Sequence, residues 1–383
     1  MKKAFHFSRS EMSIPEKLWR VSWSFVLLIV LIASLGFLTL YSAAGGSMAP
    51  WASRQIVRFG VGVAVLLVMA MIDIRFWMKW AYVFYGAGLI LLVAVEFKGS
   101  VGMGAQRWID LGVIQIQPSE IMKIALILAL ARYFHGLNYQ DVGRITLLIP
   151  PIVMVLAPVL LVLKQPDLGT AMMLFLGGVA IFFIAGVRLW KFAVVLLLGL
   201  AAAPIAWRFL HEYQKKRILI FLDPEKDPLG AGYHITQSKI ALGSGGTFGK
   251  GYMKGPQSYL DFLPEKHTDF IFTMIGEEWG MVGGATLVTL YALVLIFGFV
   301  ISLRARSQFA RLVGLGFSTT FFLYVFINIA MVMGLAPVVG VPLPLISYGG
   351  TAMLTLLIGF GLLLSIHVHR DVMIGRRGAG DDY

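Results

Sequence analysis

Apolar residues recur along most of the chain in runs of about 20, separated by short polar connections. A run of that length lets an α-helix cross a hydrocarbon layer about 30 Å thick, whereas a barrel strand needs only about ten residues. The pattern therefore predicts an all-α integral membrane protein with about ten transmembrane helices. The predicted spans are 21–41, 54–73, 76–95, 118–134, 144–163, 168–186, 189–210, 270–302, 309–335 and 346–367.

Composition agrees with this fold class. Of the 383 residues, 58% are hydrophobic and only 14% are charged, which is more apolar than a soluble core of this length uses. The net charge is +12, but the basic residues lie at the ends of apolar runs, where they orient helices and contact anionic headgroups, so we expect no nucleic-acid partner. The absence of cysteine excludes a disulfide framework, a thiolate nucleophile and a Cys-ligated metal.

Lysine and arginine are concentrated in alternate connections, and this asymmetry predicts the topology. By the positive-inside rule both chain ends are cytoplasmic, and the long polar segment between helices seven and eight is extracytoplasmic. The prediction divides the chain into a cytoplasmic tail (1–20), a single membrane domain (21–368, including the extracytoplasmic loop 211–269) and a second cytoplasmic tail (369–383).

Prolines mark two irregular places in the membrane domain. Pro150, Pro151 and Pro158 fall inside the fifth span, and Pro337, Pro342 and Pro344 precede the last one. Because proline lacks a backbone donor and bends or breaks helices, both segments are predicted to be kinked and locally unwound.

Polar residues at the extracytoplasmic ends of the spans are the candidates for chemistry. Glu120 and Lys123 share one face of the fourth helix and either line a wet cavity or form a structural ion pair. Arg107 can pair with a phosphate, and Trp108 either stacks on a sugar or anchors the chain at the interface. Asp167 is accounted for fully as the N-cap of the sixth helix.

The loop 211–269 contains a predicted short helix at 233–242, a glycine run and a final acidic motif. The run 243–251 is not an ATP-binding loop, because Ser244 and Gly251 stand where that pattern needs Gly and Ser or Thr. It either offers N–H groups to a pyrophosphate, together with Lys250, or serves tight turns.

At the end of the loop, Thr268 is predicted to cap the eighth span and Asp269 to be its first residue. Asp269 is then either a first-turn acid that compensates the helix dipole or a general base at headgroup level. His234 and His267 lack metal-ligand spacing.

Six separated motifs resemble the SEDS family (shape, elongation, division and sporulation), bacterial membrane proteins that include RodA, FtsW and SpoVE. The resemblance covers nearly the whole chain beyond the first tail, and the loop is most similar to the RodA branch. The motifs are Gly104–Ile109, Gln117–Glu120 with Lys123, Gln165–Thr170, the loop Gly230–Gly251, Pro264–Phe270 and Pro344–Gly350.

The resemblance implies an inner-membrane peptidoglycan glycosyltransferase that polymerises lipid II into glycan strands during cell elongation and maintains cell shape. It implies that Asp269 is the essential loop aspartate, that Trp108 is required, and that Arg107, Glu120 and Lys123 line a central cavity. Asp167, Lys250, His267, Ser347 and Tyr348 are further candidates for substrate or pyrophosphate binding. A divalent cation, Mg or Mn, is a candidate cofactor, and no organic cofactor is expected.

The implied partners are a class B penicillin-binding protein, the MreC/MreD/MreB elongation complex, and lipid II with its undecaprenyl-linked glycan. A transporter that flips lipid II also fits the polar residues of a bundle with broken helices. A scaffold that only recruits a synthase is a third alternative. The long loop distinguishes the enzyme from the transporter, because flipping does not need it.

Overall fold

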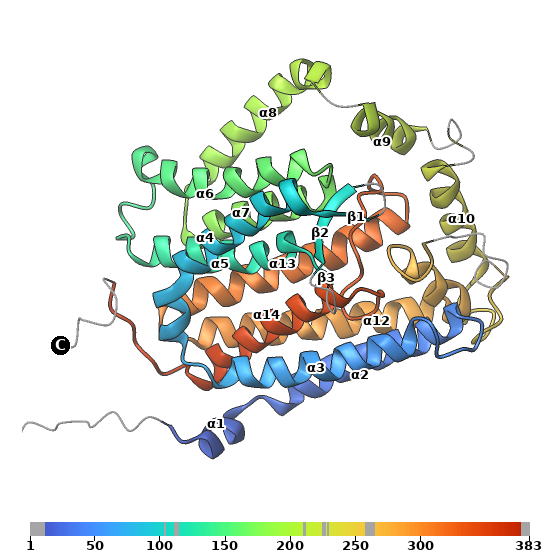
Figure 1. The fold of residues 1–383 in the computed structure, drawn as a ribbon, viewed down its shortest axis with the longest axis horizontal. Coiled ribbons are helices and arrows are strands. Elements are labelled where there is room, and N and C mark those ends of the chain that lie inside the picture. The colour runs from blue at the N-terminus through green and yellow to red at the C-terminus, as the bar shows by residue number, and fades with distance from the viewer. Residues whose placement is uncertain are drawn as a thin grey trace, which may run out of the picture.

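The computed structural model describes residues 12–102, 105–110, 115–209, 212–223, 227, 230–256 and 265–376. In this part of the chain, ten long helices lie at the places of the predicted spans, and most of them run side by side in one bundle (Figure 1). They are α2 (Trp23–Ala43), α3 (Ala52–Met71), α4 (Ile74–Lys98), α5 (Pro118–His135), α6 (Ile145–Lys164), α7 (Leu168–Ala185), α8 (Leu189–Phe209), α12 (Ile271–Arg304), α13 (Gln308–Val332) and α14 (Gly350–Val368).

Eight of these helices are long and apolar enough to cross a membrane, so the prediction of a helical multi-pass membrane protein is confirmed. The remaining two are α5, which carries Glu120, Lys123 and Arg132, and α8, whose apolar part is Leu189–Ile205. The number of crossings and the side on which the loop lies stay predictions.

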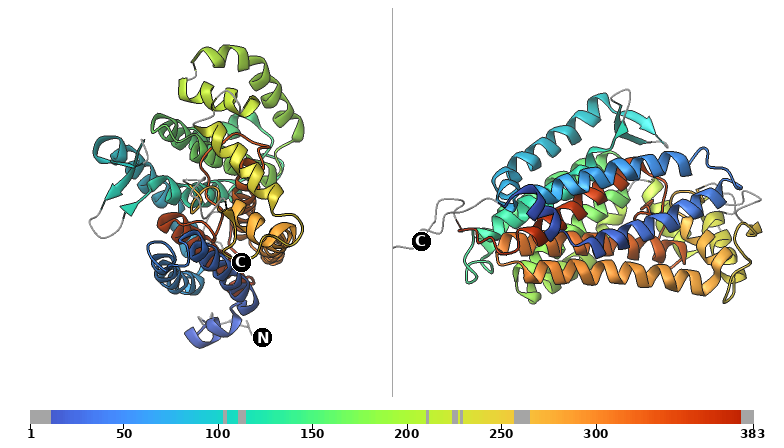
Figure 2. Two further views of the ribbon diagram at one scale, coloured as in Figure 1. Left: turned by 90° about the vertical axis from the view of Figure 1, so that its right-hand side faces the viewer. Right: turned by 90° about the horizontal axis from the view of Figure 1, so that it is seen from below.

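The core of the bundle is built around α13 and α14, in which 67% and 72% of the residues of the apolar stretch are buried. Small residues allow close approach there. A Cβ on Gly359 of α14 would overlap the ring of Phe317 on α13, so this glycine sets the distance between the two helices. By contrast, α8 stands away from the others and exposes Val195, Leu197 and Leu198 (Figures 1 and 2).

The two ends of the bundle carry different elements. One end, here called the loop end, carries α9 (Glu212–Leu222) and α10 (Ala231–Ser244), which contains the predicted helix 233–242. The opposite end, called the tail end, carries the short helix α1 (Ile14–Arg20) and the C-terminal segment 369–376. Asp371 there forms ion pairs of 3.9 Å with Arg20 and Arg306, which joins segments that the topology prediction places on one side.

A small antiparallel sheet at the loop end was not predicted. It consists of β1 (Ser100–Gly102), β2 (Ala105–Asp110) and β3 (Gln115–Ile116), in the order β1-β2-β3. Trp108 pairs with Ser100, and Ile109 pairs with Ile116. Short runs of β-prone residues separated by glycine are the usual hairpin signal. The sheet places Arg107 in a strand and not in a flexible connection.

The prediction that prolines unwind the fifth span is wrong, because α6 is continuous from Ile145 to Lys164. Pro158 and Pro151 leave the carbonyls of Met154 and Leu147 without their helical donors. The hydroxyl of Tyr85 donates to Met154 O at 2.9 Å, and that of Tyr133 donates to Leu147 O at 2.7 Å. Side chains from α4 and α5 therefore satisfy the carbonyls that the prolines leave free. The proline-rich segment 333–349 is non-helical, as predicted.

The true break in a long helix lies in α12, where Gly280 has φ +66° and ψ −160°. The glycine run packs into this break: Met281 N donates to Gly246 O at 2.9 Å and Val282 N to Thr247 O at 3.1 Å. A Cβ on Gly280 would overlap the backbone nitrogen of Gly249. The glycines of 245–251 therefore serve close backbone packing, and Gly246, Gly249 and Gly251 have the positive φ angles of tight turns, which were the structural alternative left open by the sequence.

Candidate active site

Asp269 lies in a tight turn, residues 265–270, directly before α12. The helix begins at Ile271 with Phe270 as its N-cap, so the expectation that Thr268 caps it and that Asp269 is its first residue is wrong. The Thr268 hydroxyl instead donates to the Glu265 carboxylate at 2.6 Å. That bond closes the turn on itself, and Asp269 is held outside the helix.

The Asp269 side chain is partly buried and surrounded by charges. Its pKa is raised from 3.8 to about 6, mainly by burial and also by the nearby Glu265, whereas Arg217 and Arg107 oppose the shift. Asp167 is also close enough to act on this carboxyl. The turn therefore presents a carboxylate that is more basic than an ordinary aspartate and is still mostly ionised at neutral pH.

Arg107 and Asp167 form the second part of the site. Arg107 Nη1 lies 3.6 Å from Asp167 Oδ2, and its Nη2 donates to the carbonyl of Pro166 at 2.6 Å. Asp167 also accepts from Thr170 N at 3.1 Å, which confirms its N-cap role on α7. Strand β2 and the α6–α7 turn thus meet beside Asp269.

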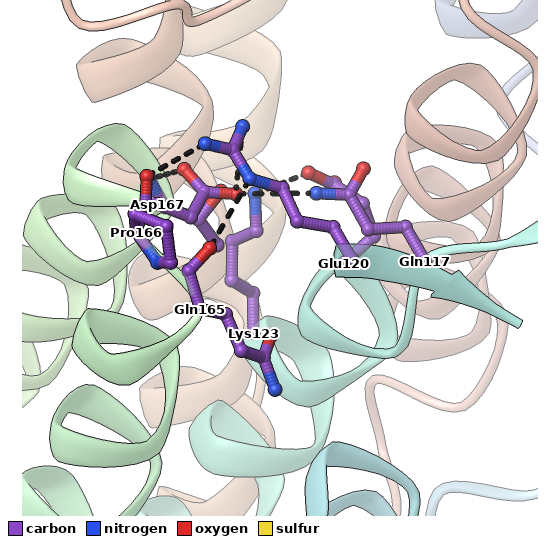
Figure 3. A network of polar contacts seen from close by, with 8 residues as sticks. Gln117, Glu120, Lys123, Gln165, Pro166 and Asp167 are labelled. Atoms are coloured by element: carbon purple, nitrogen blue, oxygen red, sulfur yellow. Dashed lines mark hydrogen bonds and ion pairs between the residues drawn. The ribbon is translucent and has the colours of Figure 1, made fainter. Parts of the chain in front are cut away.

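Glu120, Lys123 and Tyr324 form a closed triad one layer deeper, between α5 and α13. Lys123 Nζ donates to Glu120 Oε1 at 2.7 Å and also to the Tyr324 hydroxyl, which donates to Glu120 Oε2 at 2.8 Å. They line a small cavity with Thr320 and Thr355. Gln117, at the start of α5, donates to Asp167 at 3.4 Å and connects the triad to the Arg107–Asp167 pair (Figure 3). Glu120 and Lys123 therefore form the structural ion pair that was one of the two alternatives, and the cavity that they line is small. Tyr324 was not predicted, because one tyrosine in an apolar helix gives no signal.

The candidates His267, Ser347 and Tyr348 hold the turn against the segment 333–349. The His267 ring stacks on Trp51, with centroids 4.3 Å apart and planes 10° apart, and lies 6.1 Å from the ring of Tyr348. The guanidinium of Arg58 lies over the ring of Tyr348, 5.0 Å from its centroid. Burial lowers the pKa of His267, so the ring is neutral and stacks as an aromatic.

Gln55 of α3, fully buried, fixes the same segment from the other side. Its Nε2 donates to Ser347 O at 2.9 Å, and its Oε1 accepts from Gly349 N at 3.4 Å. Sequence reasoning missed Gln55, because it stands alone between charged neighbours on an otherwise apolar helix. Its amide fixes the segment 347–349 to helix α3 of the bundle.

Lys250 is occupied by a buried partner. Its Nζ donates to Glu277 Oε1 at 2.8 Å, and its backbone N–H and that of Gly251 donate to the carbonyls of Glu277 and Glu278 at 3.0 Å. Glu278 in turn accepts from the hydroxyl of Ser42. Glu277 and Glu278 thus satisfy neighbours within the bundle, and the lysine that is a candidate for pyrophosphate binding closes the glycine run onto α12.

Trp108 follows Arg107 on β2 and is half-buried. Because successive side chains of a strand point to opposite faces, it lies on the face of the hairpin away from the Asp167 contact. Its role in substrate binding stays a prediction. Among the residues that the structure describes, no three His, Asp or Glu side chains are grouped closely enough to hold a metal ion by themselves.

Comparison with known proteins identifies relatives along nearly the whole chain. Residues 18–372 match the model of the FtsW, RodA and SpoVE family, described as "Cell cycle protein". The chain is 47% identical over 352 residues to the peptidoglycan glycosyltransferase MrdB of Escherichia coli strain K12, covering 91% of this chain and 94% of that protein. It is 32% identical over 426 residues to the peptidoglycan glycosyltransferase RodA of Treponema pallidum, covering 91% and 98%.

Solved structures agree with the fold. The rod shape determining protein RodA of Thermus thermophilus superimposes with a TM-score of 0.68 at 31% identity, covering 91% of this chain and 97% of that one. A chain from a structure described as "Structural coordination of polymerization and crosslinking by a peptidoglycan synthase complex" superimposes with a TM-score of 0.79 at 34% identity, covering 91% and 98%.

Proposed function

Because the chain belongs to the SEDS family of FtsW, RodA and SpoVE proteins, we propose that it is a peptidoglycan glycosyltransferase whose general base is Asp269. Relatives that match nine-tenths of its length carry the name of that activity. The observation that carries the residue assignment is the turn 265–270. It holds a carboxylate with a pKa of about 6 beside Arg107 and Asp167, at the loop end of the bundle.

The reaction joins two lipid-linked glycans. The 4-hydroxyl of the acceptor lipid II attacks the anomeric carbon of the growing strand, and its proton passes to the Asp269 carboxylate. The bond from the anomeric carbon to the pyrophosphate oxygen breaks as the new glycosidic bond forms. Undecaprenyl pyrophosphate leaves with the electron pair, and the configuration inverts. A carboxylate with a pKa near 6 is about nine-tenths ionised at pH 7 and can accept this proton.

Arg107 is the best-placed group to stabilise the leaving pyrophosphate. It is 25% exposed, has a planar set of donors, and acts on the charge of Asp269. Lys123 is 6% exposed and already bonded to Glu120 and Tyr324. Lys123 therefore contributes its positive charge from within the triad below the site. Direct contact with the pyrophosphate would require the triad to open. Trp108 supplies a stacking surface for a sugar.

A divalent cation, Mg or Mn, fits the chemistry of this site. Arg107, Lys123 and Lys250 are each already paired with a carboxylate. A magnesium ion needs only one or two protein carboxylates when substrate phosphates supply other ligands. Asp269 or Asp167 would provide that ligand, and the cation would supply charge stabilisation for the leaving group. Chelation should then lower the rate without unfolding the protein.

We place the protein in the bacterial inner membrane with both termini cytoplasmic and the loop end outside, where lipid II is polymerised. The proposed partner is a class B penicillin-binding protein that crosslinks the strands. Support comes from the chain of a peptidoglycan synthase complex that superimposes on this one. The resemblance to the RodA branch supports work within the MreC/MreD/MreB complex during elongation.

The test of Asp269 uses purified protein and labelled lipid II in detergent. Asp269→Asn keeps the shape of the side chain and removes the base, so glycan polymer should fall by at least about 100-fold. Asp223→Asn, a second loop carboxylate on a different segment, is the matched control and should retain activity.

The assignment would be refuted if the Asp269→Asn variant polymerised lipid II as fast as the unchanged chain. Wild-type protein that yields no polymer and still moves lipid II across vesicles would establish the transporter instead. If Asp269→Asn leaves cell shape and partner contacts normal, the chain acts as a scaffold.

A further inference from the structure

Three consecutive carbonyls of the Asp269 turn each accept a hydrogen bond from outside the turn. His267 O accepts from Tyr348 N at 2.9 Å, and Thr268 O accepts from the Ser347 hydroxyl at 2.7 Å. Asp269 O accepts from Asn328 Nδ2 at 2.8 Å. The backbone of the base and of the two residues before it is therefore held from two directions, by the segment 333–349 and by α13.

Asn328 differs from the other two donors because it belongs to a long helix of the core. It is fully buried in α13, and its two N–H groups are divided between Asp269 O and Val341 O, the latter at 2.7 Å. One amide group thus ties the base-bearing turn and the loop 337–341 to the same rigid element. Gly340, with φ +74°, brings that loop so close that a Cβ on it would lie 3.4 Å from Asp269 Oδ2.

The amide is costly where it stands. Its Oδ1 is buried and has no hydrogen-bond partner among the residues that the structure describes. An unsatisfied polar atom in a helix interior works against stability. An amide that only joins helices would be more stabilising if its oxygen were hydrogen-bonded as well as its N–H groups. Both donors of the amide are bonded, in contrast, and one of them holds the residue that carries the base.

We propose that Asn328 is a positioning residue for catalysis, which fixes the backbone of Asp269 so that its carboxylate meets the acceptor hydroxyl. This proposal rests on the function proposed for Asp269. A general base acts only within hydrogen-bond reach of the proton it takes, and a displacement of about 1 Å lowers a rate by about 100-fold. The two segments that adjoin Asp269 are a turn and the start of α12, so the position of the base depends on these side-chain donors.

The experiment compares Asn328→Leu, which has similar volume and no donor, with the unchanged chain in lipid II polymerisation across pH 5–9. We expect kcat to fall by about 10–100-fold, with the KM for lipid II changed by less than about twofold. The acid limb of the pH profile should move from about 6 towards the value of an ordinary carboxylate, because a loosened turn admits water to Asp269.

Ser318→Ala is the matched control. Ser318 is a buried residue of the same helix whose hydroxyl donates within the helix to Gly314 O at 2.8 Å, with no contact to the turn. It should leave kcat, KM and the acid limb unchanged. Ser347→Ala removes one of the three groups that donate to the carbonyls of the turn, and it leaves α13 unchanged. It should lower kcat less than Asn328→Leu does, again with little change in KM. It keeps the proposal testable if Asn328→Leu does not fold.

Rates are normalised to the folded fraction, which gel filtration and thermal unfolding measure. Asn328→Leu and Ser347→Ala with lowered stability and unchanged kcat and acid limb would show a purely structural role and overturn the proposal. A raised KM with kcat retained would show substrate binding and also overturn it. Activity retained by Asp269→Asn would overturn the proposed base instead, so the two failures are distinguishable.

Discussion

Three cations at the loop end are each paired with one carboxylate. Arg107 pairs with Asp167, Lys123 with Glu120, and Lys250 with Glu277. Breaking one member of a buried pair costs much more than removing both, because a charge is left in a medium of low polarity. Substitutions of single residues therefore distinguish a structural pair from a group that binds substrate.

Lys250 offers the clearest case. Glu277 is 1% exposed and Lys250 29%, so Lys250→Met leaves the carboxylate buried without this ammonium and should destabilise the protein by about 3 kcal/mol. The double variant Lys250→Met/Glu277→Gln should recover most of that loss. Thermal unfolding in detergent measures both. A double variant that is stable but has a raised KM for lipid II would instead return Lys250 to pyrophosphate binding.

The Asp269 carboxyl links pH to stability. Burial raises its pKa from 3.8 to about 6, so its contribution favours the folded state below pH 3.8 and is lost as the pH rises through 6. At pH 8 the ionised group costs up to about 3 kcal/mol. Asp269→Asn should therefore be inactive and yet raise the apparent Tm at pH 8 by a few degrees, with the difference shrinking below pH 5. Equal Tm values at pH 8 would contradict the burial of the charge.

At the scale of elements, the break in α12 decides how the glycine run is held. Gly280 adopts a conformation open only to glycine, and the backbone of Gly249 fills the space of its missing side chain. The helix ladder is interrupted there, and residues 246 and 247 supply the carbonyls for the next two N–H groups. The loop and the helix break therefore form together.

Gly280→Ala should consequently destabilise the loop end by more than about 3 kcal/mol and lower activity with it. Gly284→Ala is the control four residues further along α12. The nearest atom to its new Cβ would be Phe272 Cζ at 3.5 Å, an ordinary contact, so stability should stay equal or rise by up to about 1 kcal/mol. Proteolysis of the loop measured beside Tm would report the loss, and equal resistance of the two variants would contradict it.

Long helices were predictable because an apolar run of 20 residues has few other structures open to it. The sheet β1–β3, helix α1 and helix α9 were not, because elements of two to eleven residues depend on their neighbours more than on their own sequence. The prolines of α6 were misread for a related reason. Whether a freed carbonyl breaks a helix depends on whether a donor such as Tyr85 reaches it, and the sequence does not contain that distance.

At the scale of the whole molecule, four separate segments converge at the loop end: β2, the turn 165–167, the turn 265–270 and the segment 333–349. The topology prediction placed Arg107, Asp167 and Asp269 on the same side of the membrane, because their segments lie at the corresponding ends of alternating spans. It could not identify Gln55, Tyr324 or Asn328. Each is a polar residue of a largely apolar helix, and only packing shows that its side chain supports the site.

The orientation of the bundle can be tested directly, because the chain contains no cysteine. Phe248 at the loop end is 80% exposed and Tyr139, in the turn between α5 and α6, is 82% exposed. A membrane-impermeant maleimide should label Phe248→Cys in intact spheroplasts and label Tyr139→Cys only after the membrane is permeabilised. The reverse pattern would invert the topology, and labelling of both in intact cells would show that Tyr139 is not cytoplasmic.

The pairing of Arg107, Lys123 and Lys250 with their carboxylates also bears on how a strand grows. A pocket of unpaired cations would bind the spent undecaprenyl pyrophosphate as tightly as the substrate and would slow its departure. Where the positive charges are already balanced, the anion gains little by staying. On the proposed function, the lipid carrier can then leave after each bond, and the lengthened glycan can shift by one disaccharide to receive the next unit. Charge balance in this bundle thus favours repeated turnover over tight capture.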